Sequence, residues 1–156
     1  MLDVLDKDPT MSGRTWLWAQ GIERGLDNPF SGYGYNGFWY VGQSYAELYW
    51  QKFQIEHKYG FHFHNLYIEA FVELGFIGLA SVVFFFLSAF VKIIYLVSRY
   101  GLGLESSLFI GVVTLFFIRS IASVEQLGPF GIQSFLFYTI YLKLMEFKAD
   151  KKVLAK

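Results

Sequence analysis

The sequence predicts an all-α integral membrane protein, with an extracytoplasmic loop region that carries a short amphipathic helix, followed by three transmembrane helices. The 156 residues are 54% apolar and 21% aromatic, and only 17% are charged. This balance is poor for a soluble domain of this size. The second half contains three long apolar runs, and lysines crowd its end. The zero net charge gives no basic excess for binding nucleic acid, and the absence of cysteine excludes a disulfide framework.

The three apolar runs are close to the length of about 20 residues that a membrane-spanning helix needs. They are Leu74–Val91, Ser106–Val124 with an interruption at Arg119, and Gln126–Leu142. We expect the first helix to begin earlier than its apolar run, near His64. Buried helices of a soluble domain are the alternative for the two weaker runs, but little polar surface remains to cover them.

Basic residues near the ends of the runs predict the orientation. Lys92 and Arg99 flank the first connection, and five lysines follow Leu142: Lys143, Lys148, Lys151, Lys152 and Lys156. The excess of Lys and Arg on the cytoplasmic side of membrane proteins places the connection and the tail inside. We therefore predict an extracytoplasmic loop region at 1–63, a three-helix transmembrane region at 64–145 and a cytoplasmic basic tail at 146–156. No signal peptide precedes residue 63, so we expect a segment outside this chain to carry the loop region across the membrane.

The loop region has two parts. In "SGRTWLWAQGIERGLDNPF", apolar residues recur at a spacing of four, which predicts an amphipathic helix with Ser12 as N-cap and an end at Asn28-Pro29. The following segment is rich in glycine and aromatic residues, and we expect an irregular loop with one short helix around Ser44–Phe53. Its large rings predict either a lid over the outer helix ends or an anchor in the headgroup layer. These rings are Trp39, Tyr40, Tyr45, Tyr49 and Trp50.

Two motifs have plain structural interpretations. "GYGYNG", Gly32 to Gly37, matches a dinucleotide-binding fingerprint, but a helix and a proline precede it where a strand is required. A tight loop with positive φ angles explains it better. His57, His62 and His64 lie near two glutamates, so a zinc site is conceivable. The spacing of the histidines matches no zinc motif, and we expect neither a metal nor another cofactor.

One polar stripe lies at the outer end of the first predicted span. On a helix that begins near His64, Asn65, Glu69 and Glu73 fall within an arc of about 80°. Such a stripe normally faces a bundle interior or a water-filled cavity, although polar residues at a membrane interface are the alternative. Gly75 and Gly78 follow, and we expect them to let another helix pack closely.

These residue types suit base catalysis beside an anionic group. A neutral histidine can take a proton from a hydroxyl, so His64 is the candidate base. The planar fork of an arginine suits a diphosphate, so Arg14 and Arg119 are the candidate anion binders. A surface ion pair is the alternative for Arg14, and a pair with Glu125 for Arg119.

Three segments together resemble the O-antigen ligase and polymerase superfamily, with its exopolysaccharide-production polymerase branch as the nearest likeness. They are "DKDPTMSGRTWLW", "NPFSGYGYNGFW" and "HFHNLYIEAFVELGFIGL". The resemblance implies a membrane glycosyl-transfer enzyme that moves a glycan from an undecaprenyl-diphosphate-linked saccharide donor to a saccharide or lipid-linked acceptor hydroxyl, without a metal. The resemblance also implies that the transfer takes place at the outer face of the bacterial cytoplasmic membrane. By motif position, Arg14 would bind the diphosphate and His64 would deprotonate or orient the acceptor.

We accordingly assign His64 and Arg14 as catalytic, Arg119, Asn65 and Glu69 as substrate-binding, and no residue to a metal. Members of this superfamily have many more spans than the three expected here. The chain therefore resembles the C-terminal part of such an enzyme, which lacks its N-terminal transmembrane helices, and we expect it to be inactive by itself. Two alternatives stay open: an O-antigen or protein-glycan ligase of the same superfamily, and a non-enzymatic membrane scaffold or polysaccharide-exporter subunit.

Overall fold

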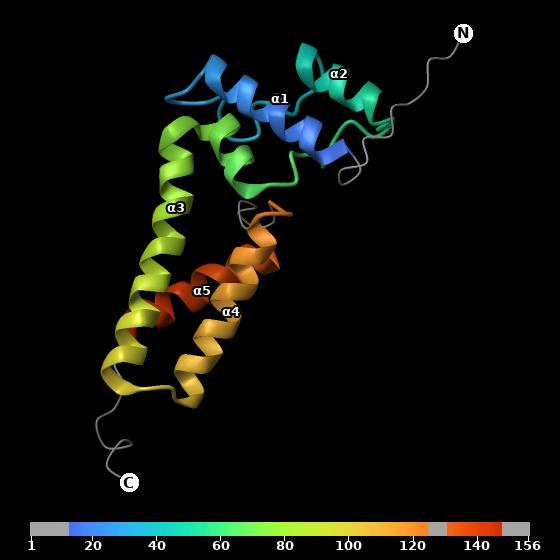
Figure 1. Ribbon diagram of the computed structural model, residues 1–156. Coiled ribbons are helices and arrows are strands. Elements are labelled where there is room, and N and C mark those ends of the chain that lie inside the picture. Colours follow the sequence, from blue (N-terminus) through green and yellow to red (C-terminus); the bar gives the residue numbers. More distant parts are fainter. Residues whose placement is uncertain (1–12, 125–130, 148–156) are drawn as a thin grey trace.

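A computed structural model describes residues 13–124 and 131–147, and within these ranges the ordered elements are helices without a strand. They are α1 (Arg14–Asp27), α2 (Ser44–Lys52), α3 (Leu66–Tyr100), α4 (Leu104–Ser120) and α5 (Ile132–Glu146). Figure 1 shows α1 and α2 together at one end of the long helix α3, with α4 and α5 beside its other part. The all-helical class predicted from the sequence is confirmed.

The boundaries of the first two helices agree with the sequence pattern. Helix α1 ends at Asp27, directly before the Asn28-Pro29 pair expected to end it, and α2 fills the short helix expected around Ser44–Phe53. Gly13, at a positive φ of 80°, is the N-cap of α1. Ser12, the expected cap, lies outside the described residues, as do the tail lysines from Lys148 onward.

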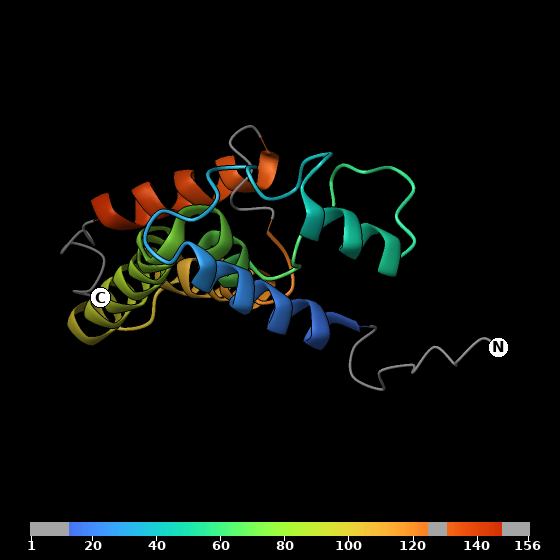
Figure 2. The same cartoon turned by 90° about the horizontal axis from the view of Figure 1, so that it is seen from above.

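Among the described residues, α3 is the one helix long and apolar enough to cross a membrane. Of the three spans expected, α4 and α5 have 17 and 15 residues in the structure. They pack against the second part of α3 through apolar side chains. Two clusters make this contact, one around Phe86, Phe116 and Phe137 and the other around Ala89, Val113 and Leu144. Viewed from above in Figure 2, α5 runs along the side of α3.

The aromatic segment folds into a core at the other end of α3. Leu17 of α1, Phe38, Tyr49 of α2, Phe63 and Val72 of α3 form one buried cluster. Of the five rings expected to form a lid or an anchor, Tyr49 and Trp50 are buried and Trp39 is partly buried, whereas Tyr40 and Tyr45 are exposed. The buried rings hold α1, α2 and the start of α3 together. We call the region formed by residues 13–74 the aromatic unit.

Helix α3 is broken near its start (Figure 1). The part before the break lies in the aromatic unit, and the part after the break packs against α4 and α5. Gly75 has a non-helical conformation, with φ 65° and ψ −158°. The carbonyls of Val72 and Glu73 therefore lose their helical partners. The backbone N–H groups of Tyr33 and Gly34 donate to them instead, at 2.9 and 2.8 Å.

The N–H group that the break leaves without a helical partner is also satisfied by the 28–37 loop. The freed N–H of Phe76 donates to the Pro29 carbonyl at 2.7 Å. A Cβ on Gly75 would lie 2.4 Å from the Phe30 carbonyl carbon, and one on Gly32 would lie 2.3 Å from that of Glu73. Gly32 and Gly75 therefore allow the 28–37 loop to approach the backbone of α3 closely.

Helix α3 begins at Leu66, as expected for a start near His64, and the break corrects the expected role of Gly75 and Gly78. The unbroken part of α3 starts at Phe76, so the continuous helix to Tyr100 extends about 37 Å at 1.5 Å per residue. That exceeds the roughly 30 Å of a bilayer core. Gly75 admits a loop backbone where we expected another helix. Gly78 packs against Leu74 and the Ala70 carbonyl of the same broken helix.

Gly75→Ala should destabilise the protein, because it adds a side chain at a positive φ and against the Phe30 backbone. A positive φ with ψ near 180° is essentially restricted to glycine, and it costs another residue about 1–3 kcal/mol. Gly111→Ala is the matched control, because nothing lies within 4 Å of a Cβ at this helical position. It should be neutral or stabilising by up to about 1 kcal/mol. Thermal unfolding of both variants in detergent measures the difference, and equal stability would contradict the proposed role of the break.

Candidate active site

The segment between α2 and α3 is fixed by Glu69, which lies on the first turn of α3 and is 4% exposed. Its Oε1 accepts a hydrogen bond from the indole Nε1 of Trp39 at 2.8 Å, and its Oε2 accepts one from the backbone N–H of Phe63 at 2.7 Å. A buried carboxylate is costly unless it is hydrogen-bonded. Glu69 therefore holds both the aromatic loop and the residue next to His64.

The two histidines of "HFH" face each other. Their ring centroids are 4.2 Å apart, and the backbone N–H of His64 donates to Nδ1 of His62 at 3.1 Å. Because Nδ1 accepts, a neutral His62 carries its proton on Nε2. His64 has a positive φ of 54°, which is uncommon for a residue with a side chain. His62 therefore stabilises the unusual backbone that positions the His64 ring.

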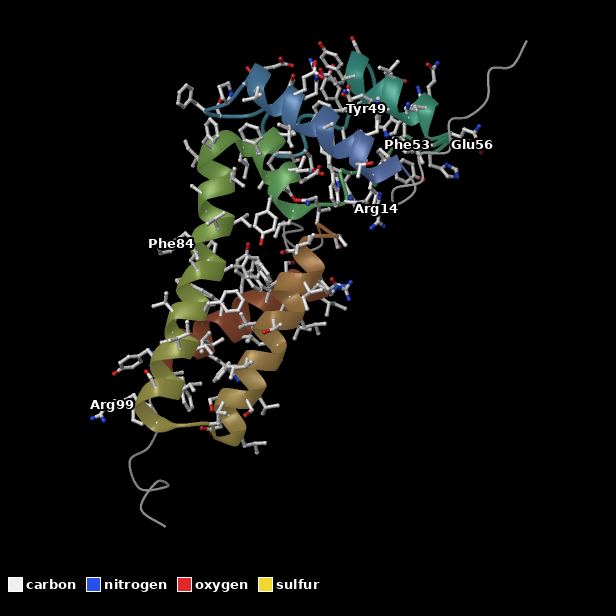
Figure 3. The ribbon with its side chains drawn as sticks, viewed as in Figure 1. Arg14, Tyr49, Phe53, Glu56, Phe84 and Arg99 are labelled. Carbon is white, nitrogen blue, oxygen red and sulfur yellow. The ribbon has the colours of Figure 1, made fainter. Side chains whose placement is uncertain are left out.

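Arg14 approaches these histidines from α1, of which it is the first residue. The indole Nε1 of Trp18, one turn further along α1, donates to the Phe63 carbonyl at 2.8 Å. This bond ties α1 to the residue before His64, so the start of α1 is held beside the histidine pair. Figure 3 shows Arg14 at the aromatic end of the molecule, remote from Arg99 at the opposite end of α3.

Burial and the charge of Arg14 keep both histidines neutral. Burial lowers the pKa of His62 to about 4, with smaller contributions from His64 and Arg14. Burial, and then the positive charge of Arg14, also lower the pKa of His64. The structure thus brings together the two residues that the sequence predicts to be catalytic, and it leaves His64 in the unprotonated form that a base requires.

A cavity of about 470 Å³ opens beside the histidine pair. His62 lines this cavity, but His64 and Arg14 are not among its lining residues. The other polar groups that line it include Glu69 and Glu73, and no lysine or arginine of the described ranges does so. The aromatic lining consists of Tyr35, Trp39, Tyr59 and Phe61.

The remaining predicted site residues have defined places. The Asn65 side chain caps α3, since its Oδ1 accepts from the N–H groups of Tyr67 and Ile68 at 3.0 and 3.2 Å. Arg119 lies exposed in the last turn of α4. Within 13–124 and 131–147, no group of three or more potential ligands could hold a metal ion.

Sequence reasoning missed three features of the site. Glu73, interpreted by itself as an interfacial residue, is 3% exposed, lines the cavity and accepts a hydrogen bond from the backbone N–H of Asn36. His62 was considered only as a metal ligand. Trp39 bonds to Glu69 across 30 residues, and no local pattern signals that contact. The stripe of Glu69 and Glu73 at helical spacing, which we expected to face a bundle interior or a water-filled cavity, was the sequence signal for this cavity.

An all-helical chain with a long apolar helix, and with a histidine and an arginine beside its start, has the features of a membrane protein with a polar site at one end of that helix. The comparison with known proteins identifies the family. A family model described as "O-Antigen ligase" matches residues 4–83, so the chain belongs to this family. The family membership predicted from the sequence motifs is confirmed, and it places the chain among membrane proteins of polysaccharide biosynthesis.

A more particular likeness is to the exopolysaccharide production protein ExoQ of Rhizobium meliloti (strain 1021). The two are 40% identical over 138 residues, which cover 88% of this chain and 32% of that protein. The chain therefore spans about a third of the length of this relative. No solved structure matches the chain.

The lowered pKa of His62 predicts a pH-dependent stability. Between pH 6.5 and about 4, an unfolded His62 binds a proton that the folded protein excludes, so stability should fall as the pH is lowered through this range and be insensitive to His62 above it. His62→Asn keeps an acceptor for the His64 N–H but does not titrate. Unfolding midpoints from pH 4.5 to 7 should therefore vary less in this variant. The same pH dependence in both proteins would contradict the assignment.

Proposed function

We propose that the chain is the C-terminal part of a membrane polysaccharide polymerase, which moves a glycan from undecaprenyl diphosphate to an acceptor sugar hydroxyl. In this proposal residues 1–63 face outward from the bacterial cytoplasmic membrane. Three helices cross the membrane within 64–145, and the basic tail at 146–156 is cytoplasmic. The observation that carries the proposal is the approach of Arg14 to a neutral His64 at the start of the apolar helix.

Arg14 is the proposed ligand of the diphosphate. It is the first residue of a 14-residue helix, where backbone N–H groups and the helix dipole also favour an anion. Its guanidinium can form two parallel hydrogen bonds to phosphate oxygens. These interactions become stronger as negative charge develops on the departing diphosphate, so they stabilise the transition state more than the bound donor.

His64 is the proposed base that takes the proton of the acceptor hydroxyl. The charge of Arg14 contributes to keeping its pKa low. A diphosphate bound at Arg14 would offset that charge, and the pKa of His64 would then rise. The base would therefore become stronger once the donor is in place. Asn65 and Glu69, predicted to bind substrate, would act by positioning this segment, and Arg119 would add a second cation at the end of α4.

Two other functions remain for comparison. A ligase of the same family would use the same Arg14 and His64 but a different acceptor, and the name of the relative favours exopolysaccharide production. A membrane scaffold or exporter subunit would have no need of a neutral histidine held beside an arginine. We also propose that activity requires further N-terminal transmembrane helices, with lipid around them. Coding sequence for such helices upstream of Met1 would support this requirement.

The activity test uses a bacterial strain that lacks its exopolysaccharide polymerase, complemented with the chain and its upstream coding sequence. His64→Ala should reduce polymer formation by about 10²–10⁴-fold without loss of the protein from the membrane, because a missing base costs that much. Arg14→Lys should also impair it, since a point charge replaces a fork. Near-normal polymer from His64→Ala would exclude a catalytic base here.

The controls for this test follow from the structure. His57→Ala changes an exposed histidine. Arg99→Lys is preferable to a change at Arg24, because Arg24 is 8% exposed, pairs with Glu23 and Asp27, and lies over the Tyr45 ring. Both controls should retain activity. Arg14→Met should in addition shift the acid limb of the pH profile to higher pH, because removal of its charge raises the pKa of His64.

The proposed orientation predicts which sites react with an impermeant thiol reagent. The chain has no cysteine, so single cysteines can be introduced without background. In intact spheroplasts, Glu56→Cys in the aromatic unit (Figure 3) should be labelled, whereas Leu102→Cys in the α3–α4 connection should be labelled only after lysis. The reverse pattern would refute the orientation.

A further inference from the structure

The residues that line the cavity beside His62 restrict the charge and polarity of the ligands that could bind there. Glu69 and Glu73 contribute two carboxyl groups, and none of the described lysines and arginines lines it. A diphosphate would therefore find no cation in this cavity, whereas Arg14 offers one. The cavity suits a ligand that is neutral, carries many hydroxyl groups, and has apolar faces.

The aromatic lining supplies a rigid flat surface. The Trp39 indole is held at its Nε1 by Glu69, and Phe61 and Phe63 contact its ring at centroid distances of 5.1 and 4.8 Å. Tyr59 adds a second ring that is 77% exposed and therefore free to close over a ligand. Aromatic walls with a few placed polar groups are typical of small-ligand sites.

The polar groups form a donor and acceptor pair. His62 Nδ1 is engaged by the His64 N–H, so Nε2 carries the proton, and it is the nitrogen able to donate to a ligand. Glu73 accepts from the Asn36 N–H, but a carboxylate has about four lone-pair sites, so it can still accept from a hydroxyl. Glu69 already accepts from Trp39 and Phe63 and acts as a positioning residue.

The geometry points to the cavity lined by Trp39, Tyr59, His62 and Glu73 as a binding site for a neutral saccharide, the acceptor glycan of the transfer reaction. The identification of this saccharide as the acceptor rests on the proposed function. The binding of a saccharide in the cavity does not depend on it. The cavity adjoins His64 through the His62 ring, which meets the His64 ring edge to face, whereas the proposed diphosphate ligand Arg14 does not line the cavity. A hydroxyl of the bound sugar can thus be directed to the base while the donor occupies the arginine.

The test measures binding of lipid-free oligosaccharide, prepared by partial acid hydrolysis of the host's own exopolysaccharide, to the purified protein in detergent. Saturation-transfer NMR detects the contact, and titration gives the dissociation constant. Glu73→Gln should weaken binding about 10- to 100-fold, the effect of losing a hydrogen bond to a charged group. Tyr59→Ala, at an exposed position outside the aromatic core, should also weaken it without affecting folding.

Glu105→Gln at the start of α4 is the matched control and should bind the oligosaccharide like the parent protein. Arg14→Met should leave oligosaccharide binding unchanged but weaken binding of inorganic pyrophosphate. If Glu73→Gln and Tyr59→Ala bind the oligosaccharide as tightly as the parent, the assignment is wrong. It is also wrong if Glu73→Gln abolishes binding of Mg²⁺ or Ca²⁺ and leaves oligosaccharide binding intact, because the cavity would then be a cation site.

A transfer assay separates failure of this inference from failure of the proposed function. If the protein with its upstream helices forms polymer, Glu73→Gln should raise the acceptor KM more than it lowers kcat, and an unchanged KM would overturn the acceptor site. If no polymer forms although the oligosaccharide binds and the Glu73 variant does not, the saccharide site stands and the transfer function fails.

Discussion

The hydrogen bonds that close the break in α3 determine the arrangement of everything else. A helix interrupted within an apolar segment leaves carbonyl and N–H groups without partners, and in a bilayer no water is present to satisfy them. Here Tyr33 and Gly34 donate to one side of the break, and Pro29 accepts from the other. The loop can approach this closely only because Gly32 and Gly75 have no side chains. The aromatic unit and the apolar helix are therefore joined at this contact.

The break also explains how a glutamate can be buried near the membrane end of a helix. The first turns of α3 lie within the aromatic unit, so Glu69 meets the Trp39 indole and the Phe63 N–H there instead of lipid. These bonds fix Phe63, whose carbonyl accepts from Trp18 of α1. One buried carboxylate thus connects three segments that are far apart in the sequence. Such a residue has a structural reason to be polar, independent of any substrate.

The sequence was sufficient for features that depend on local pattern. It predicted the helical class, the end of α1 at Asn28-Pro29, the short helix α2 and the family. It could not distinguish a glycine that allows helix packing from one that breaks a helix, because both substitute a hydrogen for a side chain in an apolar run. Gly75 was therefore misinterpreted. The partners of Glu69 and the proximity of Arg14 to His64 depend on bonds across 30 and 45 residues, which no spacing rule encodes.

The distribution of charge around the histidine pair has a consequence for a reaction with two substrates. Arg14 acts on the histidines from α1, whereas the cavity on the His62 side is lined by two glutamates and by none of the described lysines and arginines. An anionic donor and a neutral acceptor would thus be attracted to different places, and neither would block the site of the other. Because the charge of Arg14 contributes to holding the pKa of His64 down, an anion at Arg14 would raise it. In the proposed transfer reaction, the base would therefore be strongest once the anionic donor is in place.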